Sequence, residues 1–136
     1  MSGAVERRVT VRRGAGYCHT VDARQHRFIV DEPLAVGGSD TGPTPLELLA
    51  GSLGACTAAT VEMYAARKEW ELGAVEVDVK LMLPGAGQPP EFALTVRLGG
   101  ALSVDQLERL EQIARACPVR RALGADAVSE RFERLE

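Results

Sequence analysis

The chain lacks the Cys-x-x-Cys spacing of zinc sites and thioredoxin-like proteins, and it holds only three cysteines and two histidines. No Gly-Lys-Ser/Thr phosphate-binding loop is present. Acidic residues outnumber basic ones, for a net charge of −3, so we expect no basic surface for nucleic acid. No apolar run reaches the roughly 18 residues of a membrane-spanning helix, so no membrane partner is expected.

What is present fits one globular domain over residues 1–136, with 46% hydrophobic residues to build a core. Residues 1–8 pass directly into strand-like alternation, so we expect no secretory signal and a cytoplasmic location. In a reducing compartment, cysteines do not form structural disulfides. The three cysteines are therefore reactive, metal-bound or buried.

The N-terminal third predicts three short strands joined by tight links, over residues 5–13, 17–22 and 26–30. A loop dense in turn formers follows at residues 37–43. A long helix is then predicted from the cap Thr44 to about residue 68, because Pro45 and Glu47 complete a proline start and a capping box.

Two glycines interrupt that helix, and each costs ~1 kcal/mol relative to alanine. We therefore expect another backbone to approach closely at Gly51 and Gly54.

The second half predicts a hairpin, two helices and a last strand. Residues 75–82 and 92–98 alternate between apolar and polar and are joined by a loop at 84–90. Ser103 and Gln106 form a second capping box, and the helix they begin ends by residue 116 because a proline follows. A short helix at 118–123 and an edge strand at 128–135 complete an α+β domain, with an antiparallel sheet and a long central helix.

Cys117 stands where one helix ends and Pro118 opens the next, which predicts an N-cap position. The partial positive charge of a helix start favours a thiolate, and Arg120 and Arg121 follow within one turn. The alternative is a buried cysteine packed as a small apolar group.

Cys56 lies in mid-helix, with Ser52 and Thr60 one turn away on the same face. A thiolate there needs a cation or hydrogen-bond donor from another element. A cysteine packed at a tight helix crossing is an equally good interpretation. The interpretation of Cys56 as a reactive cysteine gains support only if the fold brings Cys117 close to it.

Other candidates are weaker. Cys18 could join His19 and His26 in a metal site, but no ligand pair has a finger-like spacing, so we expect no metal and no other cofactor. Arg24 and His26 could supply positive charge to a thiolate, although exposed turn residues are the commoner interpretation. Glu47 could be a catalytic carboxylate, although its capping role already explains it.

Four stretches together resemble the OsmC/Ohr family of osmotically inducible and organic hydroperoxide resistance proteins. They cover residues 26–33, 37–49, 53–57 and 116–119, and they contain both Cys56 and Cys117 within matching flanks. The order of the predicted elements agrees with this family over nearly the whole chain.

The resemblance implies an OsmC-like fold in an intertwined homodimer whose long central helices pack together. It also implies a peroxidase that reduces organic hydroperoxides in the oxidative stress response. Cys56 would be the thiolate that becomes a sulfenic acid, and Cys117 would resolve it to a disulfide. An external dithiol would then reduce that disulfide.

The chain also departs from the hydroperoxide-resistance pattern and looks closer to the OsmC-like branch. Those members carry a glutamate directly after the helix-opening proline, where this chain has Leu46 and places Glu47 one residue later. They also carry an arginine in the first hairpin, where this chain has an uncharged residue near Tyr17.

The second hypothesis is therefore a non-enzymatic dimer of the same fold that binds a small apolar or thiol-reactive ligand. A third, a metal-binding regulator, requires bound zinc.

Overall fold

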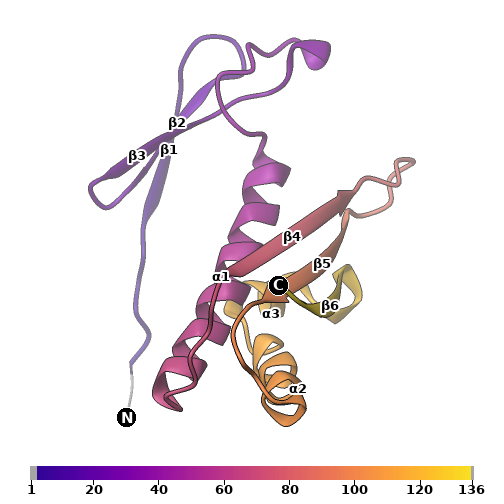
Figure 1. Cartoon of the computed structure of the whole chain (residues 1–136). Coiled ribbons are helices and arrows are strands. Elements are labelled where there is room, and N and C mark those ends of the chain that lie inside the picture. Colours follow the sequence, from indigo (N-terminus) through magenta and orange to yellow (C-terminus); the bar gives the residue numbers. More distant parts are fainter. Residues whose placement is uncertain (1–2, 136) are drawn as a thin grey trace. The chain divides into compact units, whose positions relative to one another are not determined.

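The computed structural model describes residues 3–135, and the chain forms two compact units, Met1–Leu48 and Leu49–Glu136. Figure 1 shows the elements in chain order, and helix α1 (Pro45–Arg67) begins in the first unit and continues through the second. Helices combine with mainly antiparallel strands, which confirms the predicted α+β class. Within residues 3–135 no helix has both the length and the apolar composition that crossing a bilayer requires.

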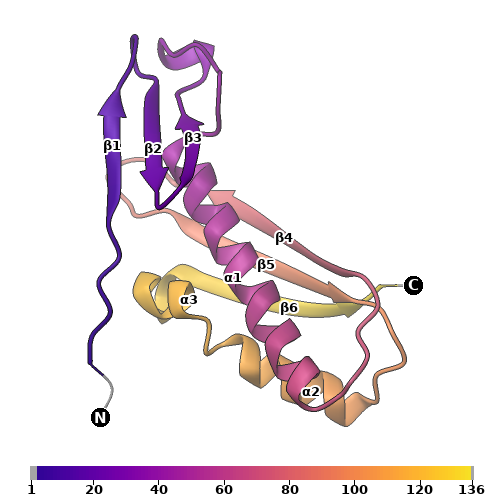
Figure 2. The same ribbon diagram turned by 90° about the vertical axis from the view of Figure 1, so that its left-hand side faces the viewer.

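The first unit is built on an antiparallel meander of β1 (Val9–Arg13), β2 (His19–Ala23) and β3 (His26–Val30), in that order across the sheet. Figure 2 shows the three strands side by side. The three predicted strands are present. The first two begin later than the alternation predicted, at Val9 rather than at residue 5 and at His19 rather than at residue 17.

Both shifts have a local cause. Arg24 turns the chain with a positive φ of 54° directly after β2 ends, so β1 has no pairing partner before Val9. At the other end, the Gly14 N–H donates to the Cys18 carbonyl at 2.8 Å. Residues 14–18 therefore close the turn between β1 and β2 and do not extend the second strand.

The buried carboxylate of Asp31 organises the loop between β3 and α1. Asp31 is only 1% exposed, and its side chain accepts hydrogen bonds from the Glu32 N–H at 2.7 Å and the Thr41 hydroxyl at 2.7 Å. The Thr41 N–H adds a third bond at 3.1 Å. The loop, which includes the short helix η1 (Leu34–Val36), is thereby folded back on itself. At Gly38 a Cβ atom would lie 2.0 Å from the Glu32 carbonyl oxygen, so only glycine fits.

Both predicted capping boxes are present. The Thr44 hydroxyl accepts from the Glu47 N–H at 3.1 Å, and the Glu47 carboxylate accepts from the Thr44 N–H at 2.9 Å. At α2 (Val104–Ala114), Ser103 and Gln106 exchange the equivalent bonds at 3.1 and 2.8 Å. These bonds satisfy N–H groups that the first turn of a helix leaves without partners, so they define where each helix begins.

The sheet of the second unit has the order β4 (Val75–Met82), β5 (Glu91–Leu98), β6 (Val128–Arg134). Strands β4 and β5 form the predicted antiparallel hairpin, and β6 is the predicted edge strand. The β5–β6 pair is parallel, because α2 and α3 (Pro118–Leu123) carry the chain back before β6 begins.

One face of this sheet is covered by helices, and α1 crosses it in Figure 2. The alternate β5 residues that face the helices are almost fully buried, and burying each side chain contributes about 1.5–3 kcal/mol. These residues are Phe92, Leu94, Val96 and Leu98, at 3%, 2%, 0% and 1% exposure.

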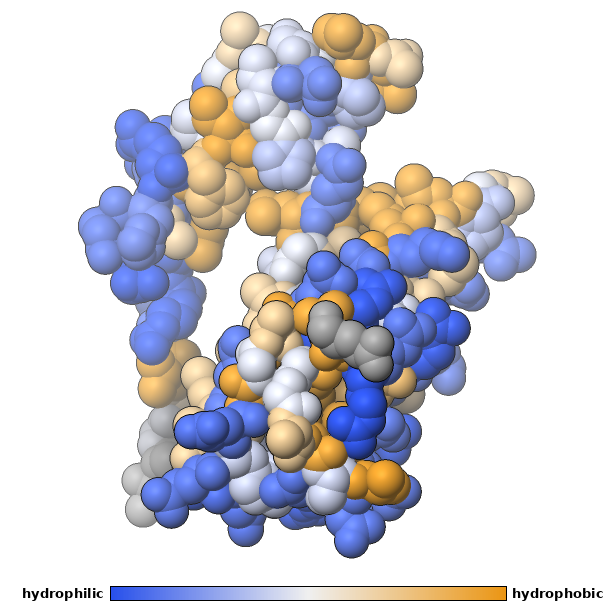
Figure 3. Space-filling view, viewed as in Figure 1, coloured by the Kyte–Doolittle hydropathy of each residue, from blue (hydrophilic) through white to orange (hydrophobic). Residues whose placement is uncertain are grey.

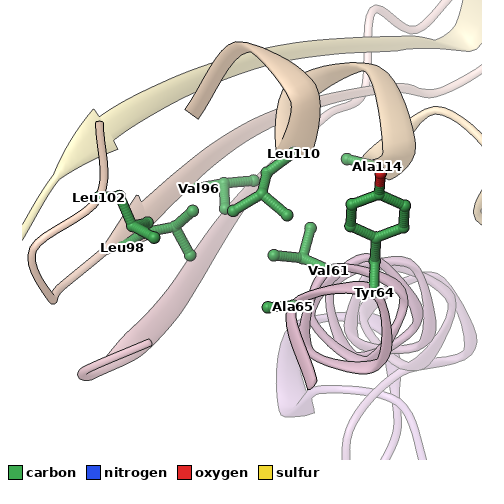
Figure 4. Packing of buried hydrophobic residues seen from close by; sticks show 8 residues of the cluster. All are labelled: Val61, Tyr64, Ala65, Val96, Leu98, Leu102, Leu110 and Ala114. Carbon is green, nitrogen blue, oxygen red and sulfur yellow. The ribbon is translucent and has the colours of Figure 1, made fainter. Parts of the chain in front are cut away.

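Figure 4 shows the larger of two core clusters, in which side chains of α1 lie between β5 and α2. The ring of Tyr64 stands on α1 and points toward Ala114 of α2. Trp70 packs edge-to-face on the same ring, with centroids 5.7 Å apart and planes at 68°. The C-terminal end of α1 is thereby locked into the core of the second unit.

The two glycines of α1 differ in their surroundings. A Cβ atom on Gly54 would lie 3.1 Å from a methyl group of Val79, so this glycine lets α1 approach β4 closely. The neighbour is a strand side chain and not the backbone that the sequence led us to expect. A Cβ atom on Gly51 would meet nothing within 4 Å in the described part of the chain.

Hydrophobic side chains also remain on the surface. Figure 3 shows them gathered over η1 and along the β4–β5 hairpin near its tip. Leu34 and Val36 of η1 are 72% and 59% exposed, and Leu83 in the hairpin loop is 63% exposed. Patches of this kind commonly mark contact surfaces.

The Asp31 hydrogen bonds predict a pH-dependent stability. They lower the pKa of Asp31, with the Thr41 hydroxyl as the largest cause and the Glu32 N–H next. A lowered folded-state pKa stabilises the fold above the unfolded value of about 3.9, and this stabilisation is lost as pH falls through the folded value. Asp31→Asn should therefore lower the urea midpoint at pH 7, measured by circular dichroism, and have a much smaller effect near pH 3.

Asp40→Asn, in the same loop but exposed, is the matched control and should behave like the parent chain at both pH values. Equal effects of Asp31→Asn at pH 7 and pH 3 would contradict the assigned role of the carboxylate.

Candidate functional site

Cys117 occupies the N-cap of α3, as predicted, and is completely buried at 0% exposure. Helix α2 ends at Ala114 with Arg115 as its C-cap, and the Cys117 N–H still donates to the Ala114 carbonyl at 3.2 Å. Pro118 then opens α3, and the Arg121 N–H donates to the Cys117 carbonyl at 3.1 Å. The sulfur makes no capping hydrogen bond to its own helix, so it is free to face another element.

Cys56 lies midway along α1 and is partly buried against the smaller core cluster, which contains Cys117, Leu53, Phe92, Leu94 and Val128. The Cys117 side chain belongs to that cluster and lies close enough to the Cys56 thiol to interact with it. Cys56 and Cys117 are 61 positions apart in the sequence, yet they are neighbours within the second unit. Packing of α1 and α3 on the same end of β5 produces this meeting.

A backbone donor also reaches the pair. The Val119 N–H, in the first turn of α3, donates to the Cys56 sulfur. The N–H at the start of α3 therefore acts on Cys56 of the neighbouring helix. The sequence had instead predicted that this helix start would favour a thiolate at Cys117. Thr60, one turn from Cys56, donates its hydroxyl to the Cys56 carbonyl at 2.7 Å and lies beside the sulfur.

The balance of these contacts raises the pKa of Cys56 above its ordinary value. Burial is the largest cause, and the hydrogen bond with Cys117 adds to it because it favours the protonated thiol. The Val119 N–H and the Thr60 hydroxyl act in the opposite direction and are outweighed. The raised pKa favours the protonated thiol of Cys56, so a thiolate there needs further positive charge nearby.

The other candidates lie in the first unit, and none of their described contacts involves a cysteine of the pair. Glu47 is exposed and held in its capping box with Thr44. Arg24 sits in the β2–β3 turn, with its guanidinium 3.5 Å from the Gln25 side chain, and His26 begins β3 with an exposed side chain.

Cys18 closes the β1–β2 turn and has the Thr41 hydroxyl 3.7 Å from its sulfur. His19 uses Nδ1 for a 3.0 Å hydrogen bond with the Tyr17 carbonyl. Over residues 3–135, no three histidine, cysteine or carboxylate side chains gather closely enough to hold a metal ion.

Sequence reasoning missed two features of the site. The Val119 N–H carries no side-chain signal and emerges only from the fold. Glu130 of β6, by contrast, could have been noticed in the sequence, because this charged residue interrupts the apolar alternation between Val128 and Phe132. Its side chain is 7% exposed and lies 3.2 Å from Arg120.

Comparison with protein-family models matches residues 37–130 to the family described as OsmC-like protein. This range contains both cysteines of the pair, α1 and the whole of α3. A search of curated proteins found no match.

Solved structures agree over nearly the full chain at low identity. An OsmC-like protein from Mycoplasma pneumoniae is 18% identical with a TM-score of 0.75, covering 99% of this chain and 98% of its own. The organic hydroperoxide resistance protein OsmC of Legionella pneumophila is 16% identical with a TM-score of 0.72, covering 99% and 100%. The protein OhrB of Bacillus subtilis, named for organic hydroperoxide resistance, is 22% identical with a TM-score of 0.66, covering 96% and 98%. These likenesses establish the shared fold.

The hydrogen bond between the thiols predicts how Cys56 responds to loss of its partner. Cys117→Ala removes an acceptor that favours the protonated Cys56 thiol but keeps the Val119 N–H, so the pKa of Cys56 should fall. The measurement is the pH dependence of iodoacetamide alkylation, read at the Cys56 peptide by mass spectrometry. Cys18→Ala is the control and should leave the profile unchanged. An unchanged or upward-shifted profile in Cys117→Ala would be incompatible with the described contact.

Proposed function

Because the chain belongs to the family of OsmC-like proteins, we propose that it reduces organic hydroperoxides with Cys56 and Cys117 as a working dithiol. The observation that carries the proposal is the contact between the two sulfurs, one partly exposed and one fully buried. The names of the Legionella and Bacillus proteins, both referring to organic hydroperoxide resistance, support the substrate class.

The proposed cycle has two oxidative steps. The Cys56 thiolate attacks the terminal peroxide oxygen, the O–O bond breaks, and the alkoxide leaves and takes a proton to become an alcohol. Cys56 is now a sulfenic acid. The Cys117 sulfur then attacks the Cys56 sulfur, releasing the oxygen as water and forming a disulfide. An external dithiol returns both thiols by exchange and is itself oxidised.

The Val119 N–H fits this chemistry, because a donor aimed at the Cys56 sulfur stabilises negative charge there. A peroxidatic thiolate needs more than this, since burial and Cys117 keep the pKa of Cys56 raised. We propose Arg24 and His26 as candidates for the missing positive charge. Glu47 would have to leave its capping box to take part.

We also propose the location, the oligomeric state and the cofactor requirement of the protein. The protein would act as a cytoplasmic homodimer in the oxidative stress response, without a bound cofactor. The exposed side chains of Leu34 and Val36 support a partner surface on the first unit.

The raised pKa of Cys56 specifically favours a second candidate function. A non-enzymatic dimer of the same fold would bind a small apolar or thiol-reactive ligand and would keep both thiols protonated. The two functions differ in their response to peroxide.

The decisive experiment treats the reduced protein with one equivalent of cumene hydroperoxide and measures intact mass and peptides. We expect a rapid loss of about two mass units, mapped to a Cys56–Cys117 disulfide. Cys56→Ser should abolish peroxide consumption, Cys117→Ser should stop after one turnover with a trapped sulfenic acid, and Cys18→Ser should behave like the parent chain. Thiols that oxidise no faster than free cysteine would reject the peroxidase and favour the ligand-binding function.

The charge candidates are tested by Arg24→Gln and His26→Gln. If either side chain supports the thiolate, its variant should shift the Cys56 alkylation profile to higher pH and slow peroxide consumption, because thiolate is the reacting species. Arg8→Gln is the control, because Arg8 is exposed and forms an ion pair with Glu6. Profiles identical to the parent in both variants would remove Arg24 and His26 from the site.

A further inference from the structure

Glu130 is a buried carboxylate on the helix-facing side of β6. The parallel register places it beside Leu94 of β5, one of the most deeply buried residues of the sheet, and its side chain is 7% exposed. Its neighbours Leu94 of β5 and Val128 of β6 belong to the cluster that contains Cys117. An ionised carboxylate is costly in such surroundings unless cations compensate it, so its partners must matter to the local structure.

Two arginines approach the same oxygen of Glu130. Arg115 Nε lies 3.4 Å and Arg120 Nη2 lies 3.2 Å from Oε1. Arg115 caps the C-terminus of α2 and Arg120 lies within α3, so they stand on either side of Cys117 in the chain. One carboxylate on the sheet therefore holds both ends of the turn, residues 115–120, that carries Cys117 and the Val119 N–H.

The contacts are electrostatic and not directional. Neither oxygen of Glu130 nor Arg120 Nε has a hydrogen-bond partner in the described part of the chain. The attraction between charges varies only slowly with distance, whereas a hydrogen bond weakens steeply when its angle changes. A turn held in this way keeps its place yet tolerates small changes of position.

Disulfide formation demands such freedom, because the two sulfurs must close to a bond of about 2.05 Å. We propose that Glu130 is a positioning residue that, through Arg115 and Arg120, holds the Cys117 turn where its sulfur can bond with Cys56. The inference rests on the proposed function for its role in turnover. Its effect on the thiol–disulfide equilibrium does not require peroxide.

The test uses that equilibrium. The full-length protein is incubated in glutathione buffers of graded ratio, and the fraction of Cys56–Cys117 disulfide is read by mass spectrometry. Glu130→Gln should lower the equilibrium constant for disulfide formation about tenfold, which corresponds to about 30 mV for a two-electron couple. Glu130→Asp keeps the charge and should recover part of the loss.

Glu133→Gln is the matched control. Glu133 lies on the same strand, but it pairs with Arg97 and Arg131 on the opposite face of the sheet, so its variant should retain the parent equilibrium. Leu110→Ala tests for a general loss of stability. It removes a fully buried side chain from the other core cluster and should lower the unfolding midpoint without changing the thiol–disulfide constant.

If Glu130→Gln does not fold, Arg115→Glu replaces it. Arg115 is 59% exposed, so the fold should tolerate a reversed charge that repels Glu130, and the disulfide constant should again fall. Arg131→Glu, reversed on the opposite face, is its control. An unchanged constant in the folded Glu130 variant or in Arg115→Glu, or an equal fall in the controls, would overturn the proposal.

In peroxide-treated protein the same variants should accumulate Cys56 sulfenic acid, trapped with dimedone, because the second step slows. If the protein does not react with peroxide but Glu130→Gln still shifts the glutathione equilibrium, the peroxidase function is rejected and Glu130 is retained as the positioning residue. A peroxidase whose glutathione equilibrium and sulfenic acid level do not depend on Glu130 would reject this inference alone.

Discussion

Burial of the helix-facing side of β5 is the constraint on which the second unit depends. The four alternate side chains from Phe92 to Leu98 contact α1 along its length, and they divide between two core clusters. The cluster around Val96 and Leu98 locks α1 against α2. The cluster around Phe92 and Leu94 receives Cys117 and has Cys56 packed against it. The rotation of α1 that buries the first cluster therefore also determines which helix face meets α3.

The electrostatics of the site follow from this packing. Burial against an apolar cluster raises the pKa of Cys56, and Cys117 raises it further. The Val119 N–H, at the start of a six-residue helix, and the Thr60 hydroxyl oppose this rise in pKa. Protonated Cys56 is thus favoured, while the charges of Glu130, Arg115 and Arg120 hold the turn that carries Cys117.

Local patterns predicted most of the fold because their causes are local. The capping boxes at Thr44 and Ser103, the proline that opens α3 and the alternation in β4 and β5 each follow from neighbouring residues. The family resemblance supplied the pairing of Cys56 with Cys117, which spacing alone could not give. Strand β1 was predicted too long, since the end of a strand depends on whether its neighbour continues.

The interactions that the sequence did not reveal arise only after folding. The Val119 N–H is a backbone group, identical in every residue except proline, and only the placement of α3 directs it at Cys56. Glu130 looked like one more polar residue of an edge strand. Its burial depends on the parallel register with β5, which no local pattern encodes.

The edge-to-face contact of Trp70 with Tyr64 has a consequence for spectroscopy. Trp70 is the only tryptophan of the chain, and it lies at the end of α1 against the core of the second unit. Intrinsic tryptophan emission therefore reports on that unit, where both Cys56 and Cys117 reside. Unfolding confined to β1–β3 would leave this emission unchanged and needs a separate optical probe.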